Sequence, residues 1–112
     1  MVQTITASDL KALQKHAGEA AELLKQLSNQ HRLMIMCSLI GSELSVGELN
    51  ERTDLSQSAL SQHLASLRNA SLVSTRRDAQ TIFYSLQSDN VIQIIQVLKS
   101  IYCPELDTKT ES

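Results

Sequence analysis

Residues 56–86 constrain the fold most, because a helical pattern there passes directly into two strand patterns with no linker between them. Leu60, Leu64 and Leu67 recur at helical spacing, and Ser56 before them is a typical N-cap residue. The runs "LVSTRR" and "TIFYSLQ" follow, both rich in β-branched and aromatic residues and separated only by "DAQ". This pattern predicts a helix followed at once by a β-hairpin.

Helical periodicity predicts two helices before this stretch. Residues 10–27 form the first, with Ser8 as its N-cap. Residues 30–40 form the second, which is capped by Ser28 or Asn29 and stopped by the glycine that follows.

Two further helices complete the set. The run "SVGE" at residues 45–48 is a capping box that opens a short third helix. Ser88 caps a last helix with a continuous apolar stripe, and Pro104 disfavours helical geometry at the residue before it. The last helix is therefore expected to end near Tyr102.

The order of these elements predicts a winged helix-turn-helix. The third helix and the helix after Ser56 are joined by "RTDL", about the length of a helix-turn-helix turn. The fold class is therefore mainly α (α+β), with a two-stranded wing and with N- and C-terminal dimerisation helices. The 112 residues predict one such domain at 8–104, between a flexible N-terminus at 1–7 and a disordered tail at 105–112.

The first and last predicted helices are surplus to a small core, and both carry apolar stripes. A domain of this size buries only about two-thirds of its unfolded surface, so burial between two copies would stabilise it. We therefore expect a homodimer with these helices at its interface. The alternative is that both helices pack on their own domain.

The helix after Ser56 has a polar face in its N-terminal half, which is the end of a recognition helix that meets base edges. The side chains expected to contact DNA there and on the hairpin are Ser56, Gln57, Ser58, Ser61, Gln62, His63, Arg68, Arg76, Arg77 and Gln80. Composition alone favours a merely solvated helix face, and the hairpin shifts the balance towards DNA. For His63, packing against a neighbouring helix is favoured over a DNA contact.

Positive charge gathers in the same region. The whole chain has a net charge of −2, whereas residues 57–86 carry three arginines and one aspartate. Arg76 and Arg77 are expected to approach the phosphates or the minor groove of double-stranded DNA, with Arg68 nearby.

No apolar run approaches the roughly 20 residues that a membrane span needs, and "MVQTITASDLK" lacks the pattern of a secretory signal. We therefore expect a cytoplasmic protein with no membrane partner.

In the cytoplasm the two cysteines are expected to be reduced, metal-binding or redox-active. Cys37 lies on the apolar stripe of the second helix, and Cys103 lies at the end of the last helix. From the residues alone, two roles of the cysteines are open: they are small hydrophobic residues of the core, or they form a two-cysteine sensor.

The segment "LSQSALSQHLASLRNASLVSTRRDAQTIFYSL" resembles the signature of the ArsR/SmtB winged-helix repressors, as do "QLSNQHRLMIMCSL" and "LSVGEL". The resemblance covers about residues 20–103 and implies a homodimer that leaves an inverted-repeat operator when an inducer binds. The family often has glycine where Ser71 and Ala79 stand, and a positive φ at Ala79 would cost energy.

The combination of "RDAQ" and "YCP" resembles the two-cysteine sulfur sensors of the BigR, SqrR, YgaV and HlyU type. This resemblance implies that persulfide or polysulfide modifies or bridges Cys37 and Cys103 and so releases a repressor of sulfide-detoxification genes. HlyU-like members imply an alternative, a redox-responsive activator or anti-repressor of virulence genes.

Metal sensing and enzyme activity are the other classes considered. Metal-sensing relatives place cysteines where "LSVGEL" stands here, or histidine and acid pairs on the last helix, which here has only Asp89. Zinc prefers four ligands, and the two cysteines supply two, so we expect no metal and no cofactor.

A thiol sulfurtransferase is a distant alternative, but the chain has no Cys-x-x-Cys, glycine-rich phosphate loop or acid–base constellation. We therefore expect no catalytic residue and no enzyme.

Overall fold

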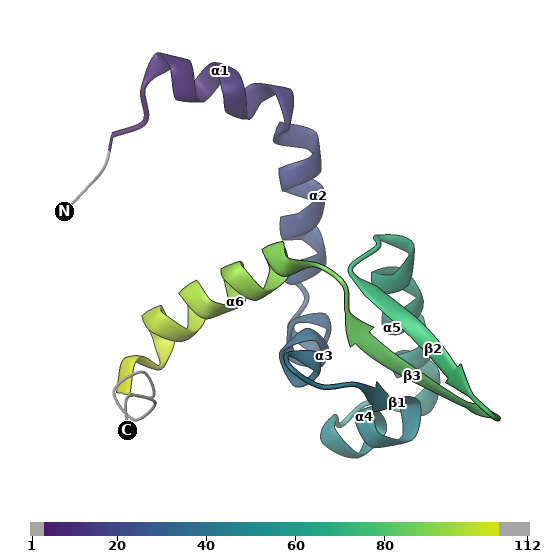
Figure 1. Cartoon of the computed structure of the whole chain (residues 1–112). Coiled ribbons are helices and arrows are strands. Elements are labelled where there is room, and N and C mark those ends of the chain that lie inside the picture. The colour runs from purple at the N-terminus through teal and green to yellow at the C-terminus, as the bar shows by residue number, and fades with distance from the viewer. Residues whose placement is uncertain (1–3, 106–112) are drawn as a thin grey trace.

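The computed structural model describes residues 4–105 of the chain, which form six helices and one small antiparallel sheet (Figure 1). The predicted disordered tail lies outside the described residues except for Glu105, and so do residues 1–3 of the predicted flexible N-terminus. The elements are α1 (Ala7–Lys15), α2 (Ala17–Leu27), α3 (Gln30–Leu39), β1 (Leu44–Ser45), α4 (Val46–Arg52), α5 (Gln57–Asn69), β2 (Val73–Asp78), β3 (Thr81–Leu86) and α6 (Asp89–Tyr102).

The core lies where α3, α4 and α5 meet the sheet. The predicted leucine face of α5 is confirmed, since Leu60, Leu64 and Leu67 are all at most 1% exposed. Ile35 and Met36 of α3 are fully buried beside them. The resulting aliphatic core fixes α5 against the rest of the domain.

Four predicted helix starts are confirmed by their capping hydrogen bonds. Asn29, rather than Ser28, caps α3 by accepting from two backbone N–H groups. Ser45 caps α4 with the predicted capping box, and Ser56 and Ser88 cap α5 and α6. Each serine hydroxyl accepts a backbone N–H that the first helical turn leaves without a partner.

The single first helix that periodicity predicts is wrong, because the chain bends at His16 and forms α1 and α2 instead. The His16 backbone N–H closes α1 on the Leu13 carbonyl at 3.0 Å, and the His16 ring lies 2.9 Å from Glu19 in the first turn of α2. The N-cap is Thr6 rather than Ser8. No residue of α1 is buried, so no packing holds the two helices in line.

The sheet has three strands in the order β1-β3-β2, not the two that the sequence predicts. The wing strands pair from Val73 opposite Leu86 to Asp78 opposite Thr81. The extra strand is Leu44–Ser45, which pairs with β3. Two residues are too few to show an alternating pattern, so periodicity cannot reveal this strand.

Both positions where the resembled family has glycine take a positive φ: Ser71 at 62° and Ala79 at 58°. Ser71 lies just after α5, where its N–H bonds the Arg68 carbonyl and the next N–H, that of Leu72, bonds the Leu67 carbonyl, both at 3.0 Å. These two bonds form the Schellman motif that usually ends in glycine. Ala79 is the first residue of the two-residue wing turn. Each side chain in this conformation costs about 1 kcal/mol.

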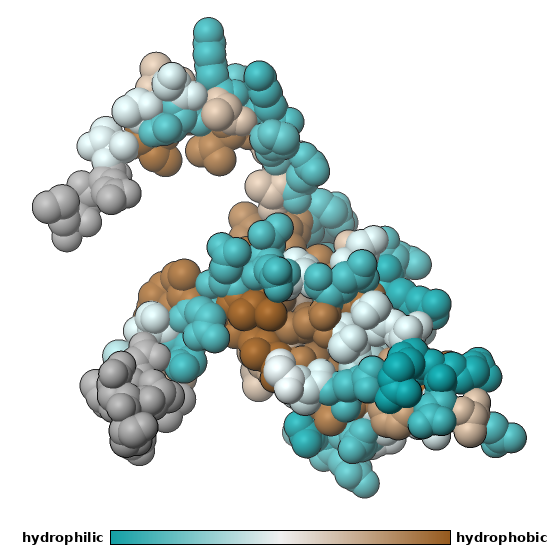
Figure 2. Space-filling view, viewed as in Figure 1, coloured by the Kyte–Doolittle hydropathy of each residue, from teal (hydrophilic) through white to brown (hydrophobic). Residues whose placement is uncertain are grey.

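Helices α1 and α6 extend away from the core as two arms (Figure 1), and their apolar residues are only partly covered. Val91 and Ile95 of α6 are buried, which confirms the first half of its predicted stripe. The space-filling view shows hydrophobic surface on both arms (Figure 2). The large hydrophobic residues more than half exposed are Ile5, Leu10, Leu13, Leu24, Met34, Val97, Ile101 and Tyr102. Among residues 4–105, no helix is long and apolar enough to cross a membrane.

Candidate DNA-binding surface and cysteine pair

The leucines on one side of α5 are buried in the core, so the polar face on its other side is exposed to solvent. Gln57, Ser58, Ser61 and Gln62 are exposed, together with the capping residue Ser56. The Ser56 hydroxyl accepts the Ala59 N–H at 3.1 Å and so fixes where the helix begins. This arrangement gives hydrogen-bonding side chains at the helix N-terminus, where a recognition helix contacts bases and phosphates.

Two contacts that the sequence did not predict hold α5 in place. The Asn50 side-chain amide donates to the Leu55 carbonyl at 2.9 Å and braces the turn between α4 and α5. The Ser66 hydroxyl donates at 3.2 Å to Gln26, a nearly buried side chain at the end of α2. Ser66 therefore faces α2 rather than the polar face, and it links α5 to α2.

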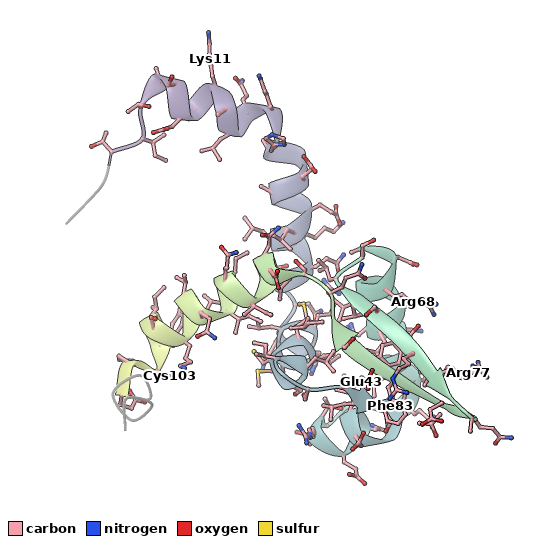
Figure 3. All side chains as sticks on the ribbon, in the orientation of Figure 1. Lys11, Glu43, Arg68, Arg77, Phe83 and Cys103 are labelled. Carbon is pink, nitrogen blue, oxygen red and sulfur yellow. The ribbon has the colours of Figure 1, made fainter. Side chains whose placement is uncertain are left out.

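The three arginines of α5 and the wing differ in their surroundings. Arg68 and Arg77 are exposed (Figure 3). Gln80 in the wing turn is exposed too. Arg76 is also exposed, but its guanidinium bonds both carboxylate oxygens of Glu43 at 3.0 and 2.8 Å. These positions bring the predicted cations to one end of the molecule, and one of them already has an acidic partner within the protein.

His63 lies on α5 and is half-buried, with its ring 5.9 Å from that of His31 on α3. Burial lowers the pKa of His63, and the nearby Arg32 and His31 lower it further. The ring therefore packs between two helices, in line with the packing role that the sequence favours.

We expect the free energy of unfolding to fall as the pH drops below 6.5, the ordinary pKa of histidine. A histidine with a lowered pKa binds fewer protons in the folded protein, so acid favours the unfolded chain until the folded pKa is passed. Denaturant unfolding at about pH 8 and about pH 5.5 measures this loss. His63→Gln should reduce it. An equal loss in wild type and His63→Gln would contradict this account.

The two cysteines are both free and both half-buried. Cys37 packs at the edge of the core, so its predicted inward orientation is confirmed in part, and burial raises the pKa of its thiol. Cys103 is the residue at which α6 ends, and its backbone N–H donates to the Lys99 carbonyl at 2.8 Å. This end of α6 agrees with the expectation from Pro104. Figure 3 shows Cys103 at the outer end of α6, apart from the ribbon of α3. The structure therefore does not bring the thiols together.

Within the part of the chain that the structure describes, no group of three or more histidine, cysteine, aspartate or glutamate residues is placed to hold a metal ion. Sequence patterns did not identify Glu43, which contacts Arg76 from a distant part of the chain, or Phe83, which lies opposite Arg76 on β3. A contact across 33 positions leaves no signal in periodicity or local motifs.

Comparisons with known proteins agree with this fold. Residues 29–75 match the family model described as a bacterial regulatory protein of the arsR family. The chain is 52% identical over 95 residues to the transcriptional activator HlyU of Vibrio cholerae, which covers 85% of this chain and 88% of that protein. The reduced form of that HlyU has a TM-score of 0.77 at 52% identity, covering 83% and 98% of the two chains. The transcriptional repressor BigR from Xylella fastidiosa has a TM-score of 0.79 at 42% identity, covering 83% and 95%.

Proposed function

Because the chain belongs to the ArsR family of winged-helix transcriptional regulators, we propose that it is a homodimeric repressor that reactive sulfur species release from its operator. The observation that carries this proposal is the presence of two free, half-buried thiols, one on α3 and one at the end of α6. Cys37 lies on α3, which packs against the recognition helix, and Cys103 ends α6, the arm that follows the wing. A covalent link between them would tie the DNA-reading core to this arm.

The chemistry requires only the two thiols and a persulfide. A cysteine thiolate takes the sulfane sulfur of a small persulfide, which leaves as a thiolate, and the cysteine becomes a persulfide. When both cysteines are persulfidated, the terminal sulfur of one attacks the inner sulfur of the other and expels hydrosulfide. The product is an intramolecular bridge with one extra sulfur atom.

In this proposal the product is a bridge with an inserted sulfur rather than a direct disulfide, and this distinguishes persulfide from peroxide. A disulfide requires Cα atoms within about 7 Å, and an inserted sulfur lengthens the reach of the bridge. Cys103 is the first thiol to react in this proposal, because burial keeps Cys37 protonated. Closing the bridge would pull α6 and α3 together and strain the DNA-binding shape. A difference of about 1–3 kcal/mol between the bound and released shapes suffices to change operator affinity severalfold or more.

The uncovered apolar surface of α1 and α6 supports the homodimer, since two copies could cover each other there. Two recognition helices would then read an inverted-repeat operator, and two copies would double the wing charge. The regulated genes in this proposal are those for sulfide detoxification.

A second candidate has support from one relative. HlyU of Vibrio cholerae is named as an activator, and its reduced form has been solved. The same DNA module in this chain could therefore activate or anti-repress virulence genes and respond to general oxidation.

A mobility-shift assay on an operator selected from random DNA separates the two candidates. We expect the reduced protein to bind, with affinity that falls as salt rises, and persulfide to release it while hydrogen peroxide does not. Release by both oxidants would favour the general redox regulator. Release by neither would contradict thiol control.

A further inference from the structure

The side chain of Arg76 spans the three-stranded sheet. Arg76 of β2 is opposite Phe83 of β3, which in turn is opposite Ser45 of β1. The guanidinium lies 4.8 Å from the centre of the Phe83 ring and reaches Glu43, just before β1. Figure 3 shows Glu43 and Phe83 close together beside the strands of the wing.

Glu43 occupies the edge of Arg76 that would hold a phosphate. The Arg76 Nε donates to Glu43 Oε2 at 3.0 Å, and Nη2 donates to Oε1 at 2.8 Å. This paired geometry is the one by which arginine binds phosphate oxygens as well as carboxylates. The remaining nitrogen, Nη1, lies 4.0 Å from the Asp78 carboxylate. An anion-binding edge of the wing is therefore filled by the protein's own acid.

The pair is also accessible to a competitor. The Arg76 side chain is 52% exposed and that of Glu43 is 37% exposed, so a phosphate can approach from solvent. The hydrogen bond from Arg76 lowers the pKa of the Glu43 carboxyl, so Glu43 is ionised at neutral pH. An exposed ion pair of this kind contributes little to stability, so exchanging the carboxylate for a phosphate costs little.

We propose that Glu43 is a built-in competitor of DNA phosphate for Arg76 and so sets the operator affinity of the protein. This inference rests on the proposed DNA-binding function. In the free protein Glu43 holds Arg76 back over the sheet. On DNA a backbone phosphate takes the place of the carboxylate. Glu43 thereby lowers affinity without touching a base, and the protein can be released by a modest strain.

The test measures operator affinity over a range of salt concentrations for variants in which an acidic side chain is replaced by its uncharged amide. Glu43→Gln should bind several-fold more tightly at low salt. Its plot of log affinity against log salt should keep nearly the wild-type slope, because Arg76 neutralises a phosphate in the DNA complex of both proteins. Asp78→Asn removes the same charge from the same wing and is the matched control, with a smaller gain. In an Arg76→Gln background, Glu43→Gln should give no gain beyond that of Asp78→Asn.

The proposed competition is contradicted if Glu43→Gln binds the operator no more tightly than Asp78→Asn does. It is also contradicted if Glu43→Gln still tightens operator binding in the Arg76→Gln background. Weaker binding by a folded Glu43→Gln, checked by its thermal unfolding, would make the contact a structural clamp and would also overturn it. Glu43→Ala serves as the second variant if Glu43→Gln does not fold. If the wild type binds no operator at all, the proposed function fails as well, whereas wild-type binding with no gain removes the competition alone.

Discussion

Leu13→Glu is expected to turn the proposed homodimer into a monomer and to weaken operator binding by about 100-fold or more. Leu13 is 54% exposed on α1, beside Leu10, which is 60% exposed. A carboxylate in an apolar interface loses its hydration without gaining a partner, so the second copy would dissociate. Two linked recognition helices bind two half-sites far more tightly than one helix binds a single half-site. Analytical ultracentrifugation and an operator titration measure both effects.

Lys11→Glu is the matched control on the same helix. The Lys11 side chain points outward from α1 (Figure 3), and its substitution changes the charge by more than that of Leu13 does. We expect this variant to stay dimeric and to keep most of its operator affinity. A Leu13→Glu protein that remains a dimer with unchanged affinity would exclude α1 from the interface.

Cys37→Ser and Cys103→Ser are each expected to keep operator binding and to lose release by persulfide. Serine has nearly the same size as cysteine, so the fold and the polar face of α5 should persist. A sulfur bridge needs both thiols, because serine neither accepts a sulfane sulfur nor forms the bridge. In the wild type we expect persulfide to reduce operator affinity by about 5- to 150-fold. In each variant we expect persulfide to leave the affinity unchanged.

The untreated proteins provide the control for this experiment. Equal operator affinity of the reduced wild type and both variants shows that the substitutions spare the DNA-binding surface. Normal persulfide release of either single variant would contradict the two-thiol mechanism.

Much of the domain follows from local sequence patterns. Leu60, Leu64 and Leu67 identify the buried face of α5, and capping residues place the starts of α3 to α6. Such signals are local, because a helix face and a cap need only three to seven neighbouring residues. The hairpin is equally local, since its strands are rich in β-branched residues and adjacent in the chain.

Other features depend on contacts that no local pattern encodes. The apolar stripe continues through His16, so periodicity cannot show that the chain bends there. The strand Leu44–Ser45 exists because it meets β3. The partner of Arg76 is Glu43, which lies far away in the sequence.

The candidate site also has parts that local sequence patterns predict and parts that depend on distant contacts. The exposed polar face of α5 was predictable, because the leucine positions determine which residues must point outward. The environment of each cysteine was predictable only in outline. Cys37 lies at the edge of the core rather than within it, and the position of Cys103 depends on the direction that α6 takes from the wing.

Intact mass spectrometry of the persulfide-treated protein tests the central claim most directly, with operator binding assayed on the same sample. We expect protein that has lost operator binding to carry one bridge within each chain. Its mass should exceed that of the reduced chain by at least one sulfur atom less two hydrogens, and a thiol reductant should restore both the mass and the binding. An unchanged mass in protein that has left the operator would contradict the account.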